Sequence, residues 1–136
     1  MKPEELTKQL EKNKVALVYF FSGDEDFLKE EAIRQLIAAT IEPGTEDFCL
    51  DILNGDNTDA STVLTLAATI PMMAESRVVV VKNFQRLPQK DRETIADYAD
   101  QPAPSTCLVL VTAKADLKTK IYSRLSKATT SVVFYP

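Results

Sequence analysis

A partial phosphate-binding motif lies between residues 23 and 30 of this chain. Set on the pattern G-x-x-x-x-G-K-[ST], Gly23 and Lys29 occupy the first glycine and the lysine. Leu28 stands where a second glycine would let backbone N–H groups approach phosphate, and Glu30 replaces the hydroxyl that would bind magnesium. The acids at 24–26 would repel phosphate as well. We therefore expect a degenerate, non-functional phosphate loop, or else an ordinary helix start with a surface lysine.

The acidic residue that a nucleotide hydrolase needs for magnesium is missing after the valine run at 78–81. A nucleotide hydrolase would place an aspartate for magnesium there, whereas this chain has Lys82 and Asn83. A phospho-acceptor signalling domain needs an aspartate there too, so the acids at 24–26 and Thr112 fit that class only superficially. Histidine, the usual general acid or base near neutral pH, is absent. We predict no ATP hydrolysis, no catalytic residues, no metal and no cofactor.

An apolar segment, residues 70–74, follows an amphipathic run and precedes the valine run. Pro71 should end the preceding helix and start a short new turn. Met72 and Met73 would then point about 100° apart, so both can hardly face the same core. Methionine is flexible and suits an apolar pocket on another protein. The alternative is that at least one of the pair packs under its own sheet.

Composition and charge indicate one soluble globular domain. The chain is 45% hydrophobic, and its net charge of −4 argues against a free-standing nucleic-acid binder. The stretch Lys114–Lys127 carries five bases against one acid, which is typical of a solvated helix face and leaves weak or indirect DNA contact open. The sequence has neither an apolar run long enough for a membrane span nor a signal core at its start. We therefore expect a cytoplasmic protein without membrane contact.

Runs rich in β-branched and aromatic residues alternate with helical patterns, which predicts an α/β fold. The expected architecture has three layers: a parallel five-stranded sheet with helices on both faces. The expected strands are 15–21, 48–53, 78–81, 106–112 and 131–135. The expected helices are 3–12, 27 to about 42, 60–68 with Asp59 as cap, 88–99 and 117–128. The second helix should bury a stripe that includes Phe27 and Leu28, and Cys49 and Cys107 should be core thiols inside strands.

Four short motifs occur in a recognisable order. They are Tyr19–Leu28 with its Gly-acid-acid-x-Phe-Leu turn, the turn 54–56, the segment Ile70–Arg77 before the valine run, and the lead 104–106 into the fourth strand. Together they resemble the N-terminal domain of the delta subunit of the bacterial DNA polymerase III clamp loader. The resemblance covers essentially the whole chain.

The resemblance implies an AAA+-like, P-loop-NTPase-like sheet without a functional nucleotide site, forming one domain over 1–136 of a longer protein. It also implies a tip that inserts an apolar pair, here Met72 and Met73 supported by Ile70, Pro71 and Ala74, into a pocket on the sliding clamp. Such binding would help open the ring for loading onto primed DNA, with other clamp-loader subunits joined through domains missing here. The family's strand order would put the two cysteines about 9 to 10 Å apart, too far for a disulfide.

The alternative to clamp binding is a non-hydrolysing structural subunit of another AAA+ assembly. An inert subunit of that kind has no reason to expose Met72 and Met73, whereas a clamp opener requires them to be accessible.

Overall fold

A computed structural model describes residues 1–71, 74–113 and 118–135. The strands are β1 (Val18–Gly23), β2 (Leu50–Asn54), β3 (Arg77–Lys82), β4 (Thr106–Val111) and β5 (Thr130–Phe134). All the pairings are parallel, in the order β2-β3-β4-β1-β5. Most strand residues are buried, as β-branched and aromatic runs covered on both faces should be. The predicted parallel five-stranded sheet is confirmed.

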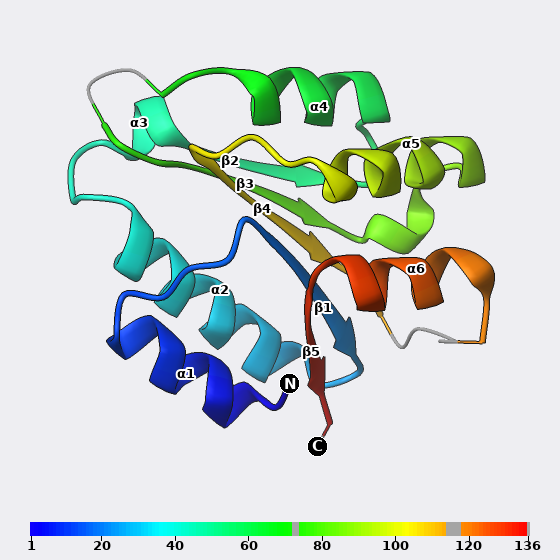
Figure 1. Cartoon of the computed structure of the whole chain (residues 1–136), viewed down its shortest axis with the longest axis horizontal. Helices are drawn as coiled ribbons and strands as arrows, with labels where there is room; N and C mark the ends of the chain where they lie inside the picture. Colours follow the sequence, from blue (N-terminus) through cyan, green and yellow to red (C-terminus); the bar gives the residue numbers. More distant parts are fainter. Residues whose placement is uncertain (72–73, 114–117, 136) are drawn as a thin grey trace.

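Helices cover both faces of this sheet (Figure 1). They are α1 (Pro3–Glu11), α2 (Asp26–Thr40), α3 (Glu46–Cys49), α4 (Ala60–Ala68), α5 (Gln89–Asp100) and α6 (Lys120–Ala128), with a 3-10 turn η1 (Phe84–Arg86). Side chains alternate along a strand, so Tyr19 and Phe21 pack with α1 and α2, whereas Phe20 packs with α4, α5 and α6. The predicted three-layer α/β architecture is therefore confirmed.

The start of the first strand differs from the prediction. It begins at Val18 rather than at Val15. The backbone N–H of Ala16 donates to the phenolic oxygen of Tyr19 at 2.9 Å, which takes this N–H out of sheet pairing. Val15 and Ala16 still pack against the core as partly buried side chains.

The second strand was also predicted too early. Phe48 and Cys49 belong to the short helix α3, and β2 begins at Leu50. The Phe48 N–H donates to the carbonyl of Thr45, which closes a helical turn that a run of apolar residues does not reveal. Cys49 is nevertheless a buried free thiol, as is Cys107 in β4.

The apolar stripe predicted for the second helix is wrong at its first turn. Phe27 is 67% exposed and Leu28 is also exposed, whereas Ala32, Ile33 and Leu36 are buried as expected. The start of α2 lies beyond the carboxyl end of β1, where the inward position is taken by Lys29.

Candidate functional site

The segment that joins α4 to β3, residues 70–76, is called here the tip segment. Ile70 is 78% exposed, Pro71 is half-buried, and Glu75 is exposed. Ala74 packs against the core beneath the sheet, so it anchors the segment. Met72 and Met73, the residues predicted to bind a partner, lie outside the described residues.

The helix that leads into the tip segment is fixed at both ends. Asp59 caps α4 as predicted, because its carboxylate accepts from the backbone N–H of Thr62 at 2.8 Å. This bond to Thr62 holds the pKa of Asp59 below its usual value. At the other end, the buried hydroxyl of Thr106 donates to the carbonyl of Ala67 at 2.7 Å. The last turn of α4 is thereby tied to the start of β4.

The residue that follows the tip segment is a buried arginine. Arg77 is 8% exposed, and its guanidinium pairs with the carboxylate of Asp51 at 2.5 Å. The same guanidinium donates to the carbonyl oxygen of Phe48 at 3.3 Å. Arg77 therefore holds α3 and the beginning of β2 against the base of the tip segment.

Gly23, the first residue of the degenerate phosphate loop, is required by the sheet. Its φ is +119°, and a Cβ atom placed there would lie 2.0 Å from the carbonyl oxygen of Phe134 in β5. A glycine is needed because the two strands approach too closely for any side chain.

Lys29 is buried, so the alternative that treated it as a surface lysine is wrong. Its ammonium group donates to the carbonyl of Gly23 at 2.9 Å and to the carbonyl of Thr112 at 3.2 Å. The carboxylate of Asp26 lies 3.3 Å from the same nitrogen. Each of these contacts uses a donor that a phosphate-binding lysine would offer to its ligand. The lysine instead joins the carboxyl end of β1 to the residue after β4.

Glu30 and Lys82 stand at the two positions where a nucleotide hydrolase would bind magnesium, and they bind each other. Their carboxylate oxygen and ammonium nitrogen are 2.9 Å apart. The ammonium group of Lys82, paired with Glu30, thus takes the place of the hydroxyl and carboxylate ligands that would hold a divalent cation.

A cavity of about 430 Å³ opens at this edge of the sheet, lined in part by Lys29, Lys82, Arg86 and Thr112. Among the described residues, its cations Lys29, Lys82 and Arg86 are each paired with an acid, and Arg86 binds Asp56 at 3.1 Å. The Thr112 hydroxyl donates to the side-chain oxygen of Gln85. These described cations are therefore neutralised by the protein itself, which weakens their attraction for a nucleotide.

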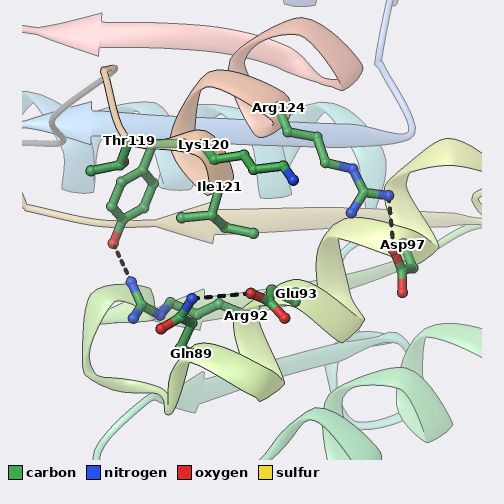
Figure 2. Close-up of a pocket in the computed structure, with 9 residues that line it drawn as sticks. Gln89, Arg92, Glu93, Asp97, Thr119, Lys120, Ile121 and Arg124 are labelled. Carbon is green, nitrogen blue, oxygen red and sulfur yellow. Dashed lines mark hydrogen bonds and ion pairs between the residues drawn. The ribbon is translucent and has the colours of Figure 1, made fainter.

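Another cavity, of about 540 Å³, is a groove between α5 and α6 (Figure 2). Arg92 donates to the hydroxyl of Tyr122 at 3.1 Å across it. Arg124, one of the predicted basic residues, pairs with Asp100 at 2.7 Å and Asp97 at 2.8 Å. Hydrogen bonds to these two aspartates raise the pKa of Arg124. The basic stretch is thus partly neutralised by α5, and its residues 114–117 lie outside the described part of the chain.

Two further observations concern the described residues only. They contain no group of three or more His, Cys, Asp or Glu side chains placed to hold a metal ion. No helix among them has the length and apolar character to cross a membrane.

Three contributors to these sites were not predicted from the sequence. The side chains of Thr106 and Gln85 form hydrogen bonds with residues far away in the sequence, and no local sequence pattern predicts these bonds. Phe48 was assigned to a strand, although the helix-favouring acids before it, Glu46 and Asp47, are a signal that could have revealed α3.

Comparison with known proteins gives a consistent result. The family model described as "DNA polymerase III, delta subunit" matches residues 19–134. The DNA polymerase III subunit delta of Bacillus subtilis is 31% identical over 130 residues, covering 88% of this chain. The chain spans 38% of the length of that curated relative.

Solved structures give the same picture. The Bacillus subtilis DNA clamp loader delta protein superposes with a TM-score of 0.90 at 26% identity, covering 98% of this chain and 42% of that one. A DNA polymerase III gamma subunit-related protein from Thermotoga maritima has a TM-score of 0.69 at 15% identity, over 97% and 45% of the two chains. The P-loop NTPase domain of an E. coli sigma-54 transport activator has a TM-score of 0.60 at 12% identity, over 98% and 94%. The last two likenesses show the fold alone.

Proposed function

Because this chain belongs to the DNA polymerase III delta subunit family, we propose that it binds the sliding clamp of the polymerase and helps to open the ring for loading onto primed DNA. The apolar residues Met72 and Met73 enter a pocket on the clamp, with Ile70 beside them and Pro71 and Ala74 shaping the segment. Other clamp-loader subunits are the remaining partners, and contact with DNA is weak or indirect. As a replication protein, it works in the cytoplasm.

The observation that carries this proposal is the exposure of Ile70. A β-branched aliphatic side chain that is 78% exposed, beside two methionines in sequence, is an apolar group available for burial by a partner. The elements that flank the segment are well supported, since α4 is tied to β4 through Thr106 and the start of β3 is tied to α3 through Arg77. Flanking elements that are already fixed lose little conformational freedom on binding.

Ring opening follows from differential affinity and needs no catalysis by this domain. A subunit that binds an opened clamp interface better than a closed one shifts the equilibrium toward the open ring. A clamp held monomeric by substitutions at its own interface should therefore bind this chain more tightly than the closed ring does. We expect no magnesium-dependent ATP binding, because Lys29 in the loop and Lys82 at the end of β3 already have partners.

The test is calorimetric binding of this chain to the sliding clamp of the same organism. The variant Met72→Ala/Met73→Ala should bind at least about a hundredfold more weakly, because burying two methionine side chains contributes about 3 to 6 kcal/mol to the binding free energy. The matched control is Phe27→Ala/Leu28→Ala, which truncates an exposed apolar pair at the opposite edge of the sheet. Equal binding by all three proteins, or none by the unmodified chain, would instead favour a non-hydrolysing structural subunit.

A further inference from the structure

The register of the sheet brings α3 beside the tip segment. Leu50 of β2 pairs with Val78 of β3, and the chain enters these strands from α3 and from the tip segment respectively. Adjacent strands lie about 4.8 Å apart, so the residues just before them are neighbours as well. Figure 1 shows α3 next to the green segment that leads directly into β3.

The orientation of α3 is fixed on two sides. Cys49 is fully buried in the core, and the carbonyl of Phe48 accepts from the guanidinium of Arg77. Neighbouring side chains of a helix point about 100° apart, so the burial of Cys49 turns the ring of Phe48 outward. The ring is 54% exposed, at the same edge of the sheet as Ile70.

Exposed acidic side chains precede Phe48 in α3, and another lies in the tip segment. Glu46 and Asp47 in α3 and Glu75 in the tip segment are all exposed. Asp47 and Glu75 form no ion pair with another described residue, and the Glu46 carboxylate accepts only from the backbone N–H of Gly44. The surface formed by Phe48 and Asp47 thus combines an exposed aromatic side chain with a carboxylate that pairs with no other described residue, the arrangement of an anchor beside a polar rim.

We propose that Phe48 is a second apolar anchor for the sliding clamp, docking on a shelf of the clamp that is edged by lysine or arginine side chains. This inference rests on the proposed function, because the shelf adjoins the pocket that takes the tip segment. Aromatic residues are enriched among the side chains that dominate binding energy, and the acids would speed association with a basic rim.

The experiment measures binding of this chain to the clamp at two salt concentrations, for Phe48→Ala and for Phe27→Ala. Both substitutions remove an exposed phenylalanine, but Phe27 lies at the opposite edge of the sheet. We expect about a tenfold loss for Phe48→Ala and less than a twofold change for Phe27→Ala. Phe48→Gln, which replaces the apolar ring with a polar side chain and should weaken binding as Phe48→Ala does, serves as a second variant, with circular dichroism to check folding.

The charge component is tested with Asp47→Asn against Asp24→Asn, two exposed acids at opposite edges. Asp47→Asn should lower the association rate and weaken its dependence on salt, and Asp24→Asn should do neither. If Met72→Ala/Met73→Ala abolishes binding while Phe48→Ala binds normally, the second anchor is wrong and clamp binding stands. Loss of binding in both phenylalanine variants would also overturn it. No binding by the unmodified chain would overturn both proposals.

Discussion

The ammonium of Lys29 and the carbonyl oxygen of Thr112 are 3.2 Å apart, although the two residues are separated by 83 positions in the sequence. This contact fixes the carboxyl end of β4 to the first turn of α2. A lysine that in a phosphate loop would hold a ligand here holds the protein's own backbone.

Replacing Lys29 with Met should lower the free energy of unfolding by about 2 kcal/mol, because two buried carbonyls lose a charged donor. The measurement is urea denaturation of both proteins. Lys8→Met, at an exposed lysine of α1, is the control and should change stability by less than about 0.5 kcal/mol. Equal effects of the two substitutions would show that the buried contacts of Lys29 contribute nothing.

Gly23→Ala should destabilise the chain by more than about 3 kcal/mol or prevent folding, since the added methyl group would meet the Phe134 carbonyl at 2.0 Å. Gly44→Ala is a close control because Gly44 also has a positive φ, +90°, but has open space around it. That variant should lose only about 1 kcal/mol, the conformational part of the cost. Thermal unfolding of the two variants separates steric conflict from backbone strain.

Thr106→Val should loosen the last turn of α4 while preserving the shape of β4. The substitution removes the hydroxyl that binds the Ala67 carbonyl, at a cost of about 1 kcal/mol. Hydrogen exchange should become faster at the amides of α4 that precede the tip segment. Thr94→Val removes an exposed hydroxyl that binds a carbonyl within α5, and α4 should exchange at its normal rate in that variant.

Cys107 should resist alkylation at pH 8 in the folded chain and react quickly in urea. Burial raises the pKa of its thiol to about 12, so the reactive thiolate is scarce while the protein is folded. The unfolded thiol ionises at lower pH than the folded one, so the folded state loses stability as the pH rises between the two values. Cys107→Ala should flatten this alkaline decrease in stability; an unchanged pH profile would contradict the raised pKa.

Much of the fold could be predicted from local patterns. The β-branched runs predicted all five strands, and β1, β3 and β4, which are buried on both faces, need little information beyond hydrophobicity. The helices α4 and α5 matched their predicted positions closely, helped by the cap at Asp59 and by the prolines that stop α5. These features depend on residues close together in the chain.

Some errors occurred where a local hydrogen bond replaced sheet pairing, as at Ala16 and Phe48, and others where distant contacts decide. Lys29 is buried beside the carbonyl of Thr112, the residue after β4, and α3 is held by Arg77, which lies 29 positions from Phe48. Neither contact leaves a trace in the local sequence. A degenerate phosphate loop was predicted from residue types alone, and the hydrogen bonds that Lys29 forms within the protein were not.

The pairing of Glu30 with Lys82 couples the two positions at which a nucleotide hydrolase would bind magnesium. Changing Glu30 to a hydroxyl residue would leave Lys82 without its acid, and changing Lys82 to aspartate would set a carboxylate beside Glu30. Each single step toward a magnesium-binding pair is therefore unfavourable until the other has occurred. The two positions depend on one another, so we expect a substitution at one of them to be accompanied by a substitution at the other during evolution.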